Sequence, residues 1–403
     1  MKNNNETISG QLDWKNNLLE TIHDIGPVLN AQAEEEDFNR RISSTSLNVL
    51  YKAGLLRLFL PNVLGGIEAE PLTVAKAVEE VSRHNAAAGW TMMVANVSSW
   101  WCARLPNRGI DELYVDGPDT FMAGAFHPPM KATPVKGGYR INGRSPLTSN
   151  VHEARWIFVT ALVMNGDQIN ITNGSPEVRG ITMDSKDVKI LDTWYTSGMC
   201  ATDSNDIEAN NVFVPEHLSF PLVPAFAPNK YFQGALYQFP AIGTAIACLI
   251  SPVALAVAQN AIDEVKSLAE RKVPLGSMVS IREKGTLQRK LGMAEALVQS
   301  SRAYLHQTIS VCWSKIRAGE SISIEEKANM LLAATHTNQS CFQAVDLMYS
   351  AAGSSAIYSK NKLSRHVANA QVIRQHGFAN DSRYETAAQI HLGLMPDLPV
   401  VAF

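Results

Sequence analysis

The spacing of apolar residues changes twice along this chain, and this change limits the folds open to it. From about residue 12 to residue 118, apolar residues recur at helical spacing, as at Leu18, Ile22 and Ile25. From Phe121 onward, short β-branched runs alternate with Gly-Gly and Asn-Gly turns. After Pro240, helical spacing returns almost to the end. The pattern predicts an α+β protein in which a β region separates two helical regions.

These changes place the expected domain boundaries. We expect an N-terminal α-helical domain over residues 1–120, a middle β domain over 121–230 and a C-terminal α-helical bundle over 231–403. Residues 136–143 are expected to form a strand–turn–strand unit with turns at Gly-Gly and Asn-Gly, and further strands are expected at 156–163, 180–183, 188–191 and 211–214. Helices long enough for a bundle are expected at 241–270, 283–318 and 325–352.

Composition indicates a globular protein of the cytoplasm. Of the 403 residues, 46% are apolar and 18% charged, which provides a large core and leaves little disorder. A net charge of −3 gives no general attraction to nucleic acid or to an anionic membrane. The five cysteines are far apart and form no CxxC or Cys/His spacing, so we expect neither disulfides nor a metal site. The first residues contain no apolar signal region.

One uncharged segment is long enough to cross a membrane. Residues 231–262 carry no charge, which reaches the length of a membrane span. The segment is rich in alanine, contains Thr244, Ser251 and Pro252, and has no flanking basic cluster. We therefore expect a helix buried in the bundle or at a subunit interface, and no membrane span.

The last part of the chain carries a candidate site for a phosphate-bearing ligand. A helical pattern ends at Gly353, the small residues Ser354 and Ser355 follow, and a second helical pattern opens toward Arg365. Such an arrangement presents unpaired backbone N–H groups together with a cation, which suits an anion.

The chain resembles the acyl-CoA dehydrogenase superfamily over essentially its whole length. The resemblance rests on the loop from Pro61 to Gly66, the run from Trp194 to Ser204, the Phe-Val-Pro strand ending at Pro215, and the C-terminal segment. It implies a helical domain, a middle β-barrel domain and a helical bundle. It also implies a flavin between the β domain and the bundle, and a homotetramer.

The resemblance assigns a first group of cofactor-binding residues to the β domain. Thr148 and Ser149 match a loop beside the flavin ring, where a hydroxyl can contact N5 or the carbonyl edge. Trp194 is expected to stack near the flavin, and Thr202 and Ser204 to contact its ribityl or phosphate part. Asp203 stands where the family usually has glycine, and a carboxylate there would repel a phosphate. An ordinary β-turn and a polar hairpin are the alternatives.

A second group of cofactor-binding residues is expected in the C-terminal domain. Gly353 is all that remains of the family's Gly-Gly-x-Gly loop, and His366 replaces the aspartate that follows the arginine matched by Arg365. The resemblance therefore leaves FMN and loosely held FAD both open. Arg282 and Gln288 match a cofactor-contacting pair, although a solvated helix face has the same composition.

Two histidines are the candidate catalytic residues. His127 precedes Pro128-Pro129 and matches the histidine that, in monooxygenases of this fold, lies over the reactive edge of the flavin. His376 matches a second histidine of that branch. Both would manage protons, because histidine titrates near neutral pH. The alternatives are a surface histidine in a proline-rich loop and a histidine on a helix face.

Glu385 is a further candidate catalytic residue, shared with the dehydrogenases. Their similar run uses a glutamate to remove the α-proton of an acyl thioester. In this chain Thr386 replaces the glycine that makes room for the thioester, and the spacing from Arg365 is longer. Catalysis by Glu385 therefore stays open.

The leading hypothesis is a flavin-dependent monooxygenase. No Gly-x-Gly-x-x-Gly motif for NAD(P)H is present, so reduced flavin (FMN or FAD) would come from a separate reductase, with O2 as co-substrate. The substrate would be a small aromatic, heteroaromatic or amino-sugar molecule. The alternative is an acyl-CoA dehydrogenase with Glu385 as base. Nucleic-acid binding is a third class, which the net charge argues against.

Overall fold

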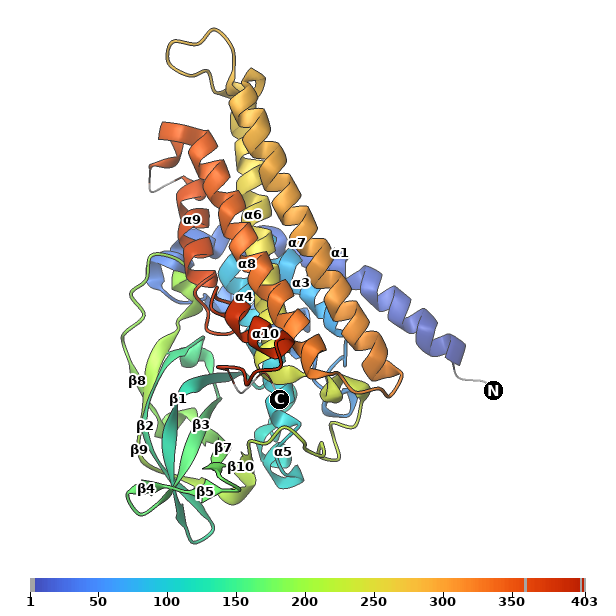
Figure 1. Ribbon diagram of the computed structural model, residues 1–403, viewed down its shortest axis with the longest axis vertical. Coiled ribbons are helices and arrows are strands. Elements are labelled where there is room, and N and C mark those ends of the chain that lie inside the picture. Colours follow the sequence, from blue (N-terminus) through green and yellow to red (C-terminus); the bar gives the residue numbers. More distant parts are fainter. Residues whose placement is uncertain (1–3, 359–360, 399–400, 402–403) are drawn as a thin grey trace.

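The computed structural model describes residues 4–358, 361–398 and 401. Helices come first, strands follow, and helices return, as the apolar spacing predicts (Figure 1). The prediction of a mixed helix-and-sheet protein is therefore confirmed. The first helical region contains α1 (Asn4–Asn39), α2 (Ser44–Lys52), α3 (Pro71–His84), α4 (Ala86–Cys102) and α5 (Asn107–Leu113). The bundle contains α6 (Ile246–Arg271), α7 (Gly285–Arg317), α8 (Ile324–Ala352), α9 (Lys362–Ile373) and α10 (Arg383–His391).

Between the helical regions, the strands form one mixed sheet and a small hairpin. The strands are β1 (Met122–Val135), β2 (Gly138–Thr148), β3 (Trp156–Asn165), β4 (Gln168–Ile169), β5 (Ile171–Thr172), β6 (Ser175–Pro176), β7 (Val178–Asp184), β8 (Lys189–Leu191), β9 (Asn205–Pro215) and β10 (Ser219–Pro221). The main sheet has the order β10-β7-β3-β1-β2-β9-β8. Within the described residues, the two end strands of this order do not pair, so the expected closure into a barrel is not confirmed.

Strand β1 was not among the expected strands, and its prolines explain why. It pairs with β3 in parallel and with β2 in antiparallel orientation, at the centre of the sheet. The register with β3 shifts between Ala125 and Met130, which leaves Pro128 and Pro129 in a bulge. Proline cannot donate to a ladder, so a central strand can carry it only where the pairing is interrupted.

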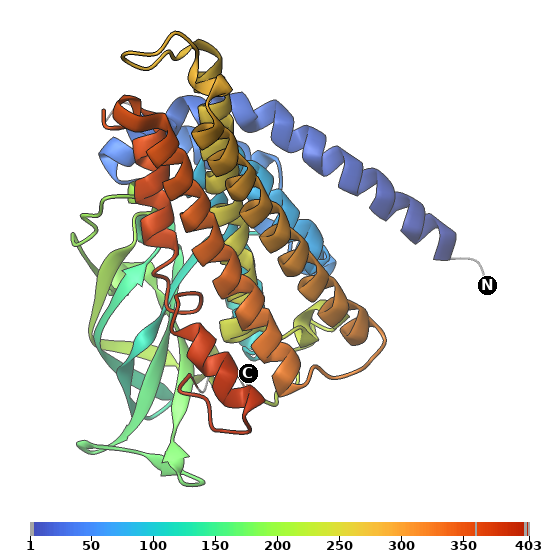
Figure 2. The ribbon, with the colours of Figure 1, turned by 45° about the horizontal axis from the view of Figure 1, so that its top comes forward.

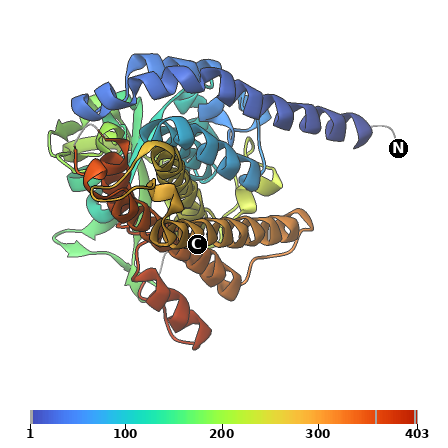
Figure 3. The ribbon, with the colours of Figure 1, turned by 90° about the horizontal axis from the view of Figure 1, so that it is seen from above.

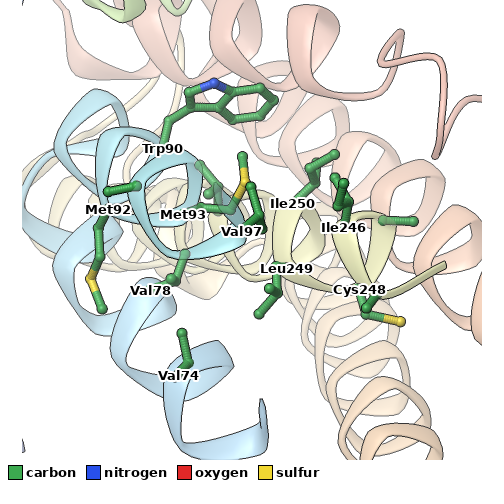
Figure 4. Packing of buried hydrophobic residues seen from close by; sticks show 14 of the residues in the cluster. Val74, Val78, Trp90, Met92, Met93, Val97, Ile246, Cys248, Leu249 and Ile250 are labelled. Atoms are coloured by element: carbon green, nitrogen blue, oxygen red, sulfur yellow. The ribbon is translucent and has the colours of Figure 1, made fainter. Parts of the chain in front are cut away.

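Helix α4 joins the first helical region to the bundle. It packs against both α3 and α6, with Met93 and Val97 facing α6, and Trp90 on the side away from Val74 of α3 (Figure 4). The side chain of Asn85 caps the helix by accepting hydrogen bonds from the N–H groups of the next turn. The same amide donates to Oε2 of buried Glu36 on α1, at 2.7 Å. The start of α4 is thereby fixed to α1.

Close packing of α3 against α4 requires a glycine. A Cβ atom at Gly89 would lie 1.8 Å from Oγ of Ser82, a distance that no real contact tolerates. Ser82 itself donates to the Val78 carbonyl within α3, so it cannot simply turn away without losing that bond. The short apolar run before Trp90 therefore contains a glycine for packing, although glycine lowers helix propensity.

Helix α6 carries the uncharged segment and runs through the middle of the bundle. By length and composition, the helical stretch Gly243–Arg271 could cross a membrane, and 89% of its most apolar window is buried inside the protein. It packs against α3, α8 and α9. This burial agrees with the expected bundle helix.

The long helices set the shape of the molecule. Helices α7 and α8 lie side by side for most of their length, with the sheet to one side of the bundle (Figure 2). Seen from above, α1 runs along one side and extends past the bundle (Figure 3). The domain limits at 120 and 230 fall in the connections between these parts and stay a prediction.

Candidate functional site

Buried hydroxyl groups gather where the end of β2, the start of β9 and helix α4 meet. Oγ of Ser149 accepts a hydrogen bond from Nε1 of Trp90 at 3.1 Å and lies 2.7 Å from Oγ of Ser204. Oγ of Ser204 is in turn 2.8 Å from Oγ1 of Thr202. The structure therefore brings together three of the residues expected to bind a cofactor. We call Ser149, Thr202 and Ser204 the hydroxyl cluster.

The residues on either side of Ser149 leave buried polar atoms without partners. Oγ1 of Thr148 and Oδ1 of Asn150 are buried and have no hydrogen-bond partner among the described residues. Asn150 has a left-handed backbone (φ 56°), and its Nδ2 donates to Oγ1 of Thr91 on α4. Buried polar atoms normally have a hydrogen-bond partner, so these two unpartnered oxygens are consistent with a polar ligand that contacts this turn. Asn150 was not singled out from the sequence.

The loop before β9 holds Trp194 against the hydroxyl cluster. The Trp194 indole is buried, and its Nε1 donates to the carbonyls of Met199 and Cys200 at 3.3 and 3.0 Å. The backbone N–H of Met199 donates to Oδ1 of Asn369 on α9 at 2.7 Å. The Asn369 side chain thus anchors the loop before β9 to the helical bundle. Asn369 has no signal in the sequence, because nothing in a helical pattern marks which polar side chain faces a distant loop.

The same loop is held by α1 from the other side. Nη1 of Arg40 donates to Oδ1 of Asp192 at 2.8 Å and to the Trp194 carbonyl at 3.1 Å. Oδ1 of Asp37 accepts from the Ala201 N–H at 3.3 Å. The loop that carries Trp194 and Thr202 is therefore clamped between the first helix and the bundle.

The carboxylate of Asp203 has its own hydrogen-bond donors beside the hydroxyl cluster. Its buried carboxylate accepts from the backbone N–H of His152 at 3.0 Å and lies 2.8 Å from Nδ1 of the same residue. It also accepts from Nδ2 of Asn205 at 2.7 Å. A left-handed backbone (φ 48°) turns the side chain toward these donors. The carboxylate is thus compensated locally.

His376 lies beside the hydroxyl cluster. Its ring centroid is 5.7 Å from that of Trp90 and 5.6 Å from that of Phe378. Burial lowers the pKa of His376 to about 4, so the ring is neutral near pH 7. Nδ1 accepts a hydrogen bond from the Phe378 N–H at 3.2 Å. A neutral ring that accepts at Nδ1 carries its proton on Nε2, which makes Nε2–H the donor left for a ligand.

The other expected histidine is exposed and does not contact His376 within the described residues. His127 is exposed on β1, and among the described residues no hydrogen bond or ring contact joins it to His376. Its neighbour Phe126 instead points inward, with its ring 5.7 Å from Phe378 and 5.6 Å from Phe158. Successive residues of a strand face opposite sides, so only one of the pair can reach the interior. A catalytic role for His127 stays a prediction.

Gly353 and Arg365 lie toward the opposite end of α9 from His376. Gly353 ends α8 with a positive φ of 57°, and Nζ of Lys272 donates to the Ala352 carbonyl and to Ser355 beside it. Nε of Arg365 is 4.0 Å from Oδ2 of Asp37 on α1. Among the described residues, no contact joins Gly353 to the hydroxyl cluster.

His366 is neutral, and the other two expected residues of this domain are solvated. Burial, and then the charge of Arg365, lowers the pKa of the adjacent His366 to about 3, so its ring is neutral. Arg282 and Gln288 are exposed, and Gln288 donates to the Arg282 carbonyl at 3.1 Å. Cofactor binding by Gly353, Arg365, Arg282 and Gln288 stays a prediction.

Glu385 faces solvent on α10. The inward position is taken by Thr386, whose hydroxyl donates to Oδ1 of Asp397 and accepts from Nη1 of Arg383 at 2.8 Å. The apolar surroundings that a thioester-type base would need do not enclose Glu385 within the described chain. This arrangement gives the dehydrogenase alternative little support.

Comparisons with known proteins show what the chain is similar to. Residues 248–381 match the family model of the acyl-CoA dehydrogenase C-terminal domain. The chain is 28% identical to an indole-3-acetate monooxygenase of Pseudomonas putida, over 94% of this chain and 93% of the relative. It is 22% identical to the oxygenase component of an FADH2-dependent resorcinol hydroxylase of a Rhizobium species, over 94% and 95%.

A solved structure shares the fold over nearly the whole chain. XiaF from a Streptomyces species, in complex with FADH2 and glycerol, superimposes with a TM-score of 0.88 at 21% identity, and covers 98% of this chain and 99% of its own. The similarity extends through both helical regions and the sheet, well beyond the C-terminal match. Over nearly its whole length the chain is thus similar to flavin-dependent monooxygenases, and its C-terminal region matches the model of the acyl-CoA dehydrogenase C-terminal domain.

Proposed function

We propose that this chain is the oxygenase component of a two-component flavin-dependent monooxygenase. It takes reduced flavin, as FMN or FAD, from a separate reductase and inserts one atom of O2 into a small organic substrate. The observation that carries the proposal is the hydroxyl cluster beside the neutral ring of His376. The buried hydroxyl of Thr148, which has no partner among the described residues, adds a hydrogen-bond donor suited to the edge of a flavin ring. Reduced flavin, when bound, supplies the electrons that activate O2.

In this reaction the protein positions the cofactor, supplies hydrogen-bond donors and excludes water from the site. Thr148 and Ser149 hold the ring edge by hydrogen bonds, and Trp194, Thr202 and Ser204 support the rest of the cofactor. Nε2–H of His376 donates a hydrogen bond toward the reacting atoms. The apolar side chains around it exclude water, which protects reactive oxygen species from unproductive loss.

The substrate we propose is aromatic rather than an amino sugar. The rings of Phe126, Phe158, Phe378 and Trp101 form a continuous series of contacts that begins beside His376. Aromatic surroundings of this kind favour a planar apolar ring, whereas a sugar needs several hydrogen-bond partners. The relatives named for indole-3-acetate and resorcinol support the same class.

We also propose a cytoplasmic homotetramer that binds neither membrane nor nucleic acid. The loop between α6 and α7 supports a subunit contact, because Val273, Leu275 and Met278 are all largely exposed there. In such an assembly the exposed Arg282 and the loop at Gly353 can meet the cofactor of a neighbour. Closure of the sheet toward a barrel and the boundaries at 120 and 230 belong to the same proposal.

A coupled assay tests the proposed function. The chain, an NADH-dependent flavin reductase, NADH and ¹⁸O2 are mixed with indole, phenol or resorcinol, and products are analysed by mass spectrometry. We expect one ¹⁸O atom in the product and little hydrogen peroxide. If all reducing equivalents appear as peroxide across a broad aromatic panel, the oxygenase assignment is wrong. Anaerobic bleaching of oxidised flavin by an acyl-CoA would instead favour the dehydrogenase with Glu385 as base.

A further inference from the structure

The hydroxyl cluster is assembled from two separate stretches of chain. Ser149 belongs to the turn after β2, residues 149–153, whereas Thr202 and Ser204 belong to the loop before β9, residues 192–204. The hydroxyls of Ser149 and Ser204 are 2.7 Å apart. A contact this short requires that the turn and the loop keep one fixed position relative to each other.

Asp203 joins this turn to this loop. Its side chain is only 2% exposed, and its Oδ2 accepts a hydrogen bond from the His152 N–H at 3.0 Å. Nδ1 of His152 lies 2.8 and 2.9 Å from the two carboxylate oxygens. A carboxylate oxygen accepts and does not donate, so Nδ1 carries a hydrogen and donates it. One side chain of the loop therefore binds both the backbone and the ring of His152 in the turn.

The same carboxylate fixes the backbone that carries Trp194. Oδ1 of Asp203 accepts from Nδ2 of the buried Asn205 at 2.7 Å, which determines the way that amide faces. Oδ1 of Asn205 then accepts from the N–H groups of Thr193 and Trp194, both at 2.9 Å. A reversed amide would place its own N–H donors against those two N–H groups. Asp203 therefore acts on the beginning of the loop as well as on its end.

The backbone at Asp203 does not itself call for a carboxylate. The residue is left-handed (φ 48°), a conformation that glycine adopts without strain, and glycine is the usual residue at this place in the family that the chain resembles. Aspartate adds a buried charge, which is costly unless hydrogen-bond donors compensate it. Those donors come from His152 and Asn205, the two residues through which the turn and the loop are held.

We propose that Asp203 is a positioning residue of the flavin site and acts through His152 and Asn205. It holds the two halves of the hydroxyl cluster within hydrogen-bond distance of each other and keeps Trp194 beside them. The inference rests on the proposed function, because the ligand that it concerns is the flavin proposed for this site.

Binding of reduced FMN, measured by anaerobic equilibrium dialysis, tests the inference. Asp203→Gly removes the carboxylate and suits the same backbone, and its dissociation constant should rise at least about tenfold, the loss expected for a charged hydrogen-bond acceptor. Asp203→Asn keeps one acceptor oxygen and should fall between Asp203→Gly and the parent chain. Asp206→Asn is the matched control, because Asp206 is a carboxylate on the strand that follows and pairs instead with Arg144. Circular dichroism verifies folding.

Hydrogen exchange of the flavin-free chain reports the same role without the cofactor. In Asp203→Gly we expect faster exchange at the His152 N–H and at the N–H groups of Thr193 and Trp194, whereas Asp206→Asn should match the parent chain. Unchanged exchange at either place would overturn the inference. Faster exchange with unaltered affinity for reduced FMN would also overturn it, because the carboxylate would then stabilise the fold without positioning the site.

The inference and the proposed function fail in different ways. A parent chain that binds reduced FMN but yields only peroxide contradicts the proposed function, and weaker FMN binding by Asp203→Gly still supports the positioning role. Oxygenated product from a parent chain that binds FMN no more tightly than Asp203→Gly supports the proposed function and contradicts the role of Asp203.

Discussion

At the scale of single residues, the hydroxyl of Ser149 links the strands of the candidate site to helix α4. It accepts from Trp90 and bonds to Ser204, so it fixes the place where strand β2, strand β9 and helix α4 meet. The sequence predicted that Ser149, Thr202 and Ser204 would serve one ligand, and the structure brings them together. The sequence could not indicate Trp90, because nothing in an apolar helical pattern shows which acceptor an indole N–H will meet.

Ser149→Ala should uncouple the reaction from flavin oxidation. Removing the hydroxyl deletes a hydrogen bond at the proposed ring edge and leaves the Trp90 N–H without its acceptor. We expect the ratio of oxygenated product to hydrogen peroxide to fall about tenfold or more. Ser300→Ala, on the exposed face of α7, is the control and should leave the ratio unchanged. Unaltered coupling in Ser149→Ala would remove Ser149 from the cofactor site.

His366 should make the fold sensitive to acid. Its pKa is lowered to about 3 in the folded chain, so between pH 6.5 and pH 3 the unfolded chain binds more protons. Its contribution to stability is therefore complete above pH 6.5 and is lost as the pH falls. His366→Asn should flatten the loss of unfolding free energy between pH 6.5 and pH 4 by up to about 1.4 kcal/mol per pH unit.

Chemical denaturation at several pH values measures this slope. His391→Asn, at an exposed position on α10, is the control and should keep the slope of the parent chain. An identical slope in His366→Asn and the parent chain would show that His366 does not titrate differently on folding.

At the scale of elements, helix spacing was a reliable guide and strand pairing was not. Helices α6, α7 and α8 begin and end within a few residues of their expected limits, since a period of 3.6 is local information. Strand β1 was not predicted, because Pro128 and Pro129 interrupt the strand pattern of its sequence. The choice of Phe126 over His127 as the inward residue depends on a register shift that only pairing with β3 determines.

The cap of α4 should carry measurable stability. Asn85→Ala removes two hydrogen bonds to the first turn of α4 and the amide that pairs with buried Glu36. We expect a loss of about 2 kcal/mol in unfolding free energy, from a lost cap and a carboxylate deprived of a donor. Asn39→Ala, at an exposed position, should change it little. Urea denaturation measures both, and equal stability of the two variants would contradict the capping role.

At the scale of the whole molecule, the order of helices, sheet and bundle was predictable, and the assembly was not. A helical pattern shows which residues are apolar but not whether a partner covers them. In the described chain, Leu275 and Met278 extend fully into solvent from the loop between α6 and α7. Exposed side chains of this size are typical of a surface that another chain covers.

Polar substitutions in this loop should weaken the proposed tetramer. Leu275→Ser combined with Met278→Ser removes apolar surface that a neighbouring subunit would bury. Sedimentation velocity should show a shift to smaller species at micromolar concentration. Val115→Ser, a similarly exposed apolar position after α5, is the control. A parent chain that sediments as a monomer would contradict the assembly itself.

The amide of Asn369 has a wider consequence for how the two halves of the molecule communicate. Its Oδ1 accepts a hydrogen bond from the Met199 N–H in the loop before β9. His376 follows seven residues later in the same stretch of chain. Asn369 lies in the last turns of α9, which ends at Ile373, and the N–H of His376 donates to the Ile373 carbonyl, so a displacement of that loop acts on the segment that carries the ring. In the proposed function, seating of the cofactor against that loop and placement of the His376 donor are therefore coupled through the end of α9.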